Sequence, residues 1–150
     1  MIKKVHYSLE AIATISNEIK KFSLIEAGGV LLGYEKDDQI YIQIATDGGP
    51  KAIHEQFYFQ ADADYIDLQI DMAYANSSGQ TVYIGEWHSH PEVNPDPSKK
   101  DLTSLMEIAS TADEYTLLLI IGAQGFKASK FEAQSLSLIC YSSSLRIFEL

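Results

Sequence analysis

Two histidines, a serine and an aspartate lie close together in the middle of the chain, at a spacing that suits a metal ion. His88 and His90 are one residue apart, and Ser98 follows after a gap of seven residues. Two further residues separate Ser98 from Asp101. Two imidazole nitrogens and one carboxylate, with a fourth position left for water, form the ligand set of a catalytic zinc site. The sequence therefore predicts that His88, His90 and Asp101 bind one zinc ion per chain.

The segments around these residues predict how they come together. The apolar run from Thr81 to Trp87 is typical of a strand, and alternate residues of a strand point to the same face, so both histidines share one face. Three prolines within residues 91–97 prevent a strand or helix from continuing and force a loop. Ser98 and Asp101 then fit the N-cap and the third residue of a new helix. Together these segments bring two nitrogens and a carboxylate to one point.

Each part of this pattern also has a purely structural explanation. A single histidine at a strand end is usually packed or exposed, and Ser98-Lys-Lys-Asp101 alone is an ordinary capping box. Two histidines and one carboxylate also form the facial triad of iron oxygenases. Those enzymes generally show His-x-Asp followed by a distant histidine on a β-rich scaffold. The combination at this spacing favours zinc, and the hydroxyl of Ser98 is additionally suited to donate to a developing oxyanion.

The motif resembles that of the JAB/MPN metalloproteases, also called the JAMM family. The resemblance rests on His88-Ser-His90-Pro, the gap to Ser98 and the spacing to Asp101. The family also has a catalytic glutamate shortly before a glycine-hydrophobic strand, and Glu26-Ala-Gly-Gly-Val-Leu-Leu-Gly fits that pattern. The resemblance implies that Glu26 is the general base and acid, that the histidines and the aspartate hold zinc, and that Ser98 stabilises the oxyanion.

The family hydrolyses peptide and isopeptide bonds, mostly after the C-terminal glycine of ubiquitin or a ubiquitin-like protein. In eukaryotic deubiquitinating members the tryptophan directly follows the glycine, whereas here Glu86 separates Gly85 from Trp87. This form resembles prokaryotic JAB proteins, some of which accompany ubiquitin-activating and ubiquitin-conjugating homologues in antiphage systems. The resemblance implies a zinc isopeptidase or peptidase that cleaves after the terminal glycine of a ubiquitin-like protein, by deconjugation or precursor processing. Homologues of activating or conjugating enzymes are the implied partners.

Two alternatives stay open beside this function. A JAB hydrolase could instead release an amino acid or another small product from a sulfur-carrier protein. A non-catalytic MPN scaffold would have a similar fold but lack the metal ligands. Here every residue of the motif is present.

Composition limits the class of protein. With 150 residues and 46% hydrophobic content, the chain is expected to form a single domain over residues 1–150. A net charge of −10 argues against non-specific binding of nucleic acid. The single cysteine cannot form an internal disulfide, which agrees with a reducing cytoplasm. The longest aliphatic run, Leu117 to Ile121, is too short to cross a bilayer. We expect a cytoplasmic protein that binds neither nucleic acid nor membrane.

The hydrophobic periodicity predicts alternating helices and strands. Helices are expected over 8–22, 62–76 and 101–111, and strands over 28–34, 39–45, 56–60, 81–87, 115–122, 136–141 and 145–148. This order predicts an α/β domain of three layers, in which helices flank a mixed sheet. The family resemblance implies the JAB/MPN fold, which is cytidine deaminase-like.

Other residues near the motif have open or ordinary roles. Glu86 shares a strand face with His88 and could orient a ligand or face solvent. Trp87 points the opposite way and is expected in the core. His6 and His54 stand far from the motif in sequence and are expected to be ordinary surface or packed histidines.

Overall fold

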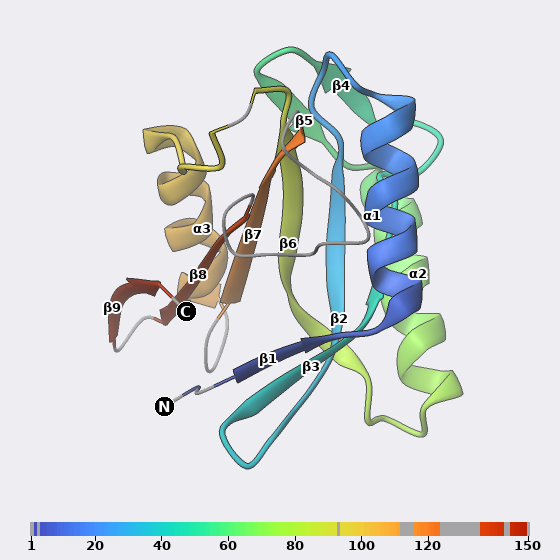
Figure 1. Cartoon of the computed structure of the whole chain (residues 1–150). Helices are drawn as coiled ribbons and strands as arrows, with labels where there is room; N and C mark the ends of the chain where they lie inside the picture. The colour runs from blue at the N-terminus through green and yellow to red at the C-terminus, as the bar shows by residue number, and fades with distance from the viewer. Residues whose placement is uncertain are drawn as a thin grey trace.

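The computed structural model describes residues 2, 4–92, 94–111, 116–123, 136–142 and 145–149. Within these ranges, the chain forms a seven-stranded mixed sheet with helices on both faces and a separate two-stranded hairpin (Figure 1). In chain order the elements are β1 (Lys4–Tyr7), α1 (Leu9–Lys21), β2 (Gly28–Lys36), β3 (Gln39–Ala45), β4 (Ile53–Glu55), β5 (Tyr58–Gln60), α2 (Ala63–Asn76), β6 (Val82–His90), α3 (Lys99–Thr111), β7 (Thr116–Gly122), β8 (Leu136–Ser142) and β9 (Leu145–Glu149). The predicted α/β class, with a mixed sheet flanked by helices, is confirmed.

The large sheet has the strand order β1-β3-β2-β6-β7-β8-β9. β1 pairs in parallel with β3, and β6 pairs in parallel with β7, whereas the other neighbouring strands are antiparallel. The first residues of β2 are all buried, as expected for a strand that is covered on both faces. The strand that follows Glu26 and the strand that carries the two histidines are therefore neighbours at the centre of the sheet.

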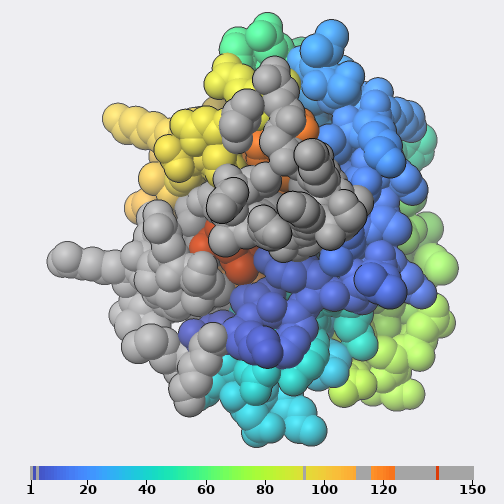
Figure 2. Space-filling model, viewed as in Figure 1, coloured from blue at the N-terminus to red at the C-terminus, as the bar shows by residue number. Residues whose placement is uncertain are grey.

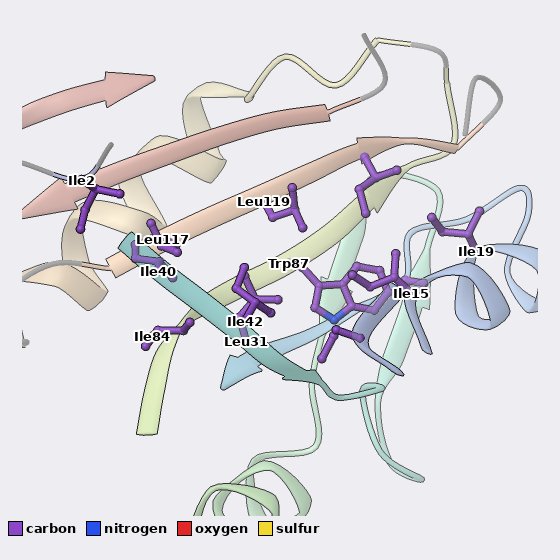
Figure 3. Packing of buried hydrophobic residues seen from close by; sticks show 14 residues of the cluster. Ile2, Ile15, Ile19, Leu31, Ile40, Ile42, Ile84, Trp87, Leu117 and Leu119 are labelled. Atoms are coloured by element: carbon purple, nitrogen blue, oxygen red, sulfur yellow. The ribbon is translucent and has the colours of Figure 1, made fainter. Parts of the chain in front are cut away.

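Helix α1 covers one face of the sheet. Its residues Ala11, Ile15 and Ile19 follow one another at intervals of four, which places them on one side of the helix, and all three are buried against the sheet. Trp87 of β6 lies in the same cluster and is only 1% exposed (Figure 3). Its Nε1–H donates to the carbonyl oxygen of Thr46 at 2.9 Å, which satisfies the indole when it is buried. The prediction that Trp87 belongs to the core is confirmed.

Helices α2 and α3 cover the opposite face. Ile66 and Ala73 of α2 pack against β2, and Leu105 of α3 packs against β7. β6 lies between β2 and β7. Because side chains alternate along a strand and Trp87 points toward α1, the two histidines of β6 point to the face that carries α2 and α3.

The β4–β5 hairpin stands at the end of the molecule where β6 finishes (Figure 1). In the space-filling view, its green residues lie beside the yellow residues that follow β6 (Figure 2). The main-chain N–H of Glu26 donates to the carbonyl oxygen of Glu55 at 2.8 Å, which joins β4 to the segment before β2. On the other side, Nζ of Lys100 lies 4.2 Å from the ring centroid of Tyr58, which joins β5 to the start of α3.

The sequence prediction misses two short strands, β1 and β4. β4 has only three residues, and β1 alternates polar and apolar residues from Lys4 to Tyr7 but is only four residues long. Every residue of both is exposed or only partly buried, so neither gives a strong strand signal. β6 ends at His90 through its pairing with β7, so both histidines belong to the strand whose alternation was predicted to place them on one face. The longest described helix, α2, has 14 residues, which is too short to span a membrane.

Candidate metal centre

Three side chains predicted as metal ligands converge at the end of β6. Nε2 of His88 lies 3.4 Å from one carboxylate oxygen of Asp101, and Nε2 of His90 lies 3.4 Å from the other. The two Nε2 atoms are 3.3 Å apart. One ligand atom from each of the three residues lies within 4.8 Å of the others, and all three side chains are partly buried. The structure therefore brings His88, His90 and Asp101 together, as the spacing predicted.

The 3.3 Å between the two imidazole nitrogens fits a tetrahedral zinc ion, and each nitrogen has a different carboxylate oxygen of Asp101 at 3.4 Å. Zinc bonds of about 2.0–2.1 Å at tetrahedral angles hold neighbouring ligand atoms about 3.3 Å apart. Nδ1 of His90 lies 3.2 Å from the carbonyl oxygen of Asn94. Because a carbonyl oxygen only accepts, Nδ1 carries a proton, which leaves Nε2 as the nitrogen of His90 that can bind a metal. Two imidazoles and a carboxylate at these distances could hold zinc.

The capping box of α3 fixes Asp101. The main-chain N–H of Ser98 donates to a carboxylate oxygen of Asp101 at 2.7 Å, and the N–H of Asp101 donates to Oγ of Ser98 at 3.1 Å. This reciprocal pair satisfies donors at the helix start and aims the carboxylate back toward β6. The predicted N-cap at Ser98 is present. The Asp101 carboxylate both accepts the hydrogen bond of the capping box and faces the two histidines.

The charges of the centre follow from these contacts. Burial by itself raises the pKa of Asp101, but hydrogen bonds from His88, His90 and the Ser98 main chain outweigh it and hold that pKa well below its usual range. The hydrogen bond to Asp101 raises the pKa of His90, although burial opposes the rise. Asp101 is thus ionised at neutral pH, as a metal ligand must be, and metal binding would displace any proton on His90.

Glu26 reaches the same place through the pairing of β2 with β6. Gly28 is opposite His88 in the register of the two strands. Beyond this pair, the N–H of Ser89 donates to the carbonyl oxygen of Ala27 at 2.8 Å, and the N–H of Ala27 donates to Oγ of Ser89 at 3.0 Å. These bonds extend the antiparallel pairing of β2 with β6 by one residue, to Ala27. Glu26, the residue before it, therefore lies beside the metal centre.

Glycine is required at position 28 for this approach. A Cβ atom there would lie 2.6 Å from the ring of Phe59 and from the carbonyl oxygen of Trp87. The glycine-hydrophobic pattern that follows Glu26 therefore reflects close packing of β2 against β6 and the hairpin.

All five predicted site residues line one cleft of about 520 Å³. Its walls are the end of β6, the first turns of α3 and the β4–β5 hairpin, which contributes Tyr58 and Phe59. Burial raises the pKa of Glu26, while the nearby His88 and His90 lower it. Glu26 is half-buried, so its carboxylate is shielded from bulk water beside the ligand atoms.

The two histidines outside the motif differ from each other. His6 is packed on Tyr41, with ring centroids 4.5 Å apart, and its Nε2 bonds to the side chain of Gln39, as expected for an ordinary histidine. His54 instead contacts the main chain of Glu26. No sequence signal marks it, because 28 residues separate the two. Glu86 is partly buried and lines the cleft, and burial raises its pKa.

The fold and the site together define a class of protein, an α/β domain that carries a His-His-Asp centre at the end of a central strand. The chain matches the family described as prokaryotic homologs of the JAB domain over residues 9–137. It therefore belongs to that family.

Comparison with individual proteins agrees with this family. The chain is 30% identical over 109 residues to a CD-NTase/cGAS isopeptidase of Vibrio cholerae, which covers 73% of this chain and 69% of that protein. It is 31% identical over 123 residues to a CD-NTase/cGAS isopeptidase of Pseudomonas aeruginosa, covering 79% and 77%. It is 35% identical over 86 residues to a protein of Sinorhizobium fredii named "probable metalloprotease", covering 56% and 52%.

A solved structure shows the same fold. The solution structure of a protein from Desulfitobacterium hafniense superposes with a TM-score of 0.68 and covers 97% of this chain and 89% of that chain. The two sequences are 17% identical, so this likeness concerns the fold alone.

Proposed function

We propose that this protein is a zinc-dependent isopeptidase or peptidase that cleaves after the C-terminal glycine of a ubiquitin-like protein, in deconjugation or in precursor processing. The observation that carries the proposal is the convergence of His88, His90 and Asp101 in one cleft with Glu26. The relatives named isopeptidase and metalloprotease support hydrolysis of an amide bond. Their names also favour a conjugate of a CD-NTase as a substrate class.

His88, His90 and Asp101 would hold one zinc ion. When bound, zinc supplies a Lewis acid that lowers the pKa of water to roughly 7 and polarises the carbonyl that is attacked. The three residues would supply the protein ligand atoms, and all three line the cleft that a substrate would enter. No covalent intermediate with the protein is needed.

Glu26 would act as general base and then as general acid. Its carboxylate takes a proton from the attacking water and gives it to the departing amine, which is a lysine side chain in an isopeptide. The partial burial that raises its pKa makes the carboxylate a better proton acceptor than an exposed glutamate. Its place beside His88 and His90 keeps the transferred proton close to the reacting atoms.

Ser98 would stabilise the negative charge that develops on the attacked carbonyl oxygen. Its Oγ accepts the N–H of Asp101, and this bond does not use the hydroxyl hydrogen. That hydrogen can therefore donate to the oxyanion.

Replacing Ser98 with alanine is expected to lower turnover by less than the 10²–10³-fold typical of a lost oxyanion donor, about 10-fold, because the metal ion shares that charge. The substitution also removes the cap of α3, which should reduce stability by about 1 kcal/mol. Ser98→Thr keeps a hydroxyl and a cap and is the matched control. Turnover, zinc content and melting temperature are measured for each variant. Equal turnover of Ser98→Ala and Ser98→Thr would remove Ser98 from the chemistry.

A substrate tail that ends in glycine is expected to be cleaved faster than one that ends in a bulky residue. The tail can lie extended in the cleft, which Tyr58, Phe59 and Lys100 line together with the metal centre. A side chain before the cut would crowd these walls, and overpacking of about 1–3 kcal/mol lowers kcat/KM by about 5- to 150-fold. Fusions of ubiquitin-like proteins with the terminal glycine kept or changed to leucine test this. Equal cleavage of both contradicts this prediction.

The two alternatives lead to different results in the same experiments. A sulfur-carrier hydrolase would release a small product and leave larger conjugates intact. A non-catalytic scaffold would cleave neither, but the intact ligand set favours catalysis. The net charge of −10 supports a protein partner over nucleic acid. We further propose that the protein acts in the cytoplasm beside homologues of ubiquitin-activating or ubiquitin-conjugating enzymes, in an antiphage system.

A further inference from the structure

His54 of β4 holds the main chain of Glu26. Its Nδ1 lies 2.9 Å from the carbonyl oxygen of Glu26. Because a carbonyl oxygen only accepts, Nδ1 carries a proton and donates it to this bond. The next residue of the same strand, Glu55, accepts the N–H of Glu26 at 2.8 Å through its own carbonyl oxygen. Two successive residues of β4 thus bind both main-chain polar groups of Glu26.

Aromatic packing fixes the orientation of the His54 ring. It stacks on Phe22, with ring centroids 3.7 Å apart and planes only 9° from parallel. It also meets Phe59 of β5 at 5.3 Å in a tilted arrangement. Phe22 lies at the C-terminal end of α1, so the His54 ring is held between that helix and Phe59 of β5. A ring fixed in this way presents its Nδ1–H in one direction.

The position of Glu26 depends on such contacts because it lies outside regular structure. Residues 22–27 connect α1 to β2 and belong to neither. On the β6 side, two hydrogen bonds to Ser89 hold Ala27, the residue after Glu26. On the other side, His54 and Glu55 of the hairpin hold the main chain of Glu26 itself. A catalytic group displaced by about 1 Å can lower the rate by about 10²-fold.

We propose that His54 is a positioning residue for the reaction, whose Nδ1–H holds the Glu26 main chain so that the Glu26 carboxylate stays aimed at the metal centre. This inference rests on the proposed role of Glu26 as the proton shuttle. The β4–β5 hairpin then has two roles. It lines the cleft with Tyr58 and Phe59, and it positions the general base.

Two substitutions of His54 separate the hydrogen bond from the packing. His54→Phe keeps a flat ring between Phe22 and Phe59 but removes the donor. His54→Asn removes the ring but keeps an N–H near the position of Nδ1. We expect His54→Phe to lower kcat at least 10-fold, with KM, zinc content and melting temperature near those of the wild type. His54→Asn should recover most of the turnover while its melting temperature falls. A purely structural role for His54 predicts the reverse order of kcat.

Hydrogen exchange gives a readout that does not depend on activity. The Glu26 amide, which bonds to Glu55, should exchange faster in His54→Phe than in His54→Asn when both are folded. His6→Phe is the matched control, since His6 is also stacked on a ring and bonded to a distant residue but does not line the cleft. It should leave kcat and the exchange of this amide unchanged. Turnover is expressed per bound zinc.

A double mutant distinguishes failure of this inference from failure of the proposed function. If His54 acts through Glu26, adding His54→Phe to Glu26→Gln should lower turnover no further. If Glu26→Gln itself keeps normal turnover, Glu26 is not the proton shuttle, and the inference falls with that part of the proposed function. If Glu26→Gln is inactive while His54→Phe matches the wild type, only the inference is overturned. Equal loss of turnover in His54→Phe and His54→Asn also overturns it.

Discussion

Replacing His88 with alanine is expected to remove bound zinc and hydrolytic activity together. The His88 ring supplies one of the three converging ligand atoms, and its Nε2 lies within 3.4 Å of both other ligands. Mutation of a residue that only supports a ligand already lowers metal affinity by about 10–100-fold. Loss of a ligand itself should lower the affinity by more. The same result is expected for His90→Ala and Asp101→Ala. Zinc per chain is measured by elemental analysis beside turnover, before and after treatment with a chelator.

Asp101 needs a separate control because it has two tasks. Asp101→Ala also breaks the capping box with Ser98, which should reduce stability by about 1 kcal/mol apart from any effect of the metal. Asp96→Ala removes an exposed carboxylate from the same loop and should keep wild-type zinc content. Because bound metal stabilises the folded state, the chelator should lower the melting temperature of the wild type but not of His88→Ala. A fully metal-loaded Asp101→Ala protein would overturn this ligand assignment.

Glu26→Gln is expected to abolish turnover without loss of zinc. The amide keeps the size and hydrogen-bonding reach of the carboxylate but cannot accept the proton of water at neutral pH. Loss of general acid–base catalysis lowers rates by about 10²–10⁴-fold, or about 3–5 kcal/mol of transition-state stabilisation. Glu26 is not one of the converging ligands, so zinc content and melting temperature should stay near those of the wild type.

The inactive Glu26→Gln protein should still bind its conjugate and could trap it for identification by mass spectrometry. Glu107→Gln, which changes an exposed glutamate on α3, is the matched control and should keep full turnover. Near-normal turnover of Glu26→Gln would show that the proton shuttle is misassigned. Glu86 is then the next carboxylate to test, because it lines the same cleft and burial raises its pKa.

The sequence by itself determined the features that depend on neighbours in the chain. The two-residue period of a strand places His88 and His90 on one face, and the capping box spans only Ser98 to Asp101. The long helices and the buried central strands carry clear apolar periodicity, so the α/β class and most elements were predicted. The role of Glu26, in contrast, came from the family pattern, because a lone glutamate before two glycines has no chemical signature of its own.

Tertiary structure alone decided which distant segments meet at the cleft. The contact between Ala27 and Ser89 joins residues 62 positions apart, and it exists because β2 pairs with β6 in one register. The hairpin could not be predicted in full, since the three residues of β4 are too few for an alternation of apolar residues to distinguish it from a loop. The bond from His54 to Glu26 depends on that hairpin and on its packing against α1. Strand register and side-chain packing fix such contacts, and neither is encoded in local residue preferences.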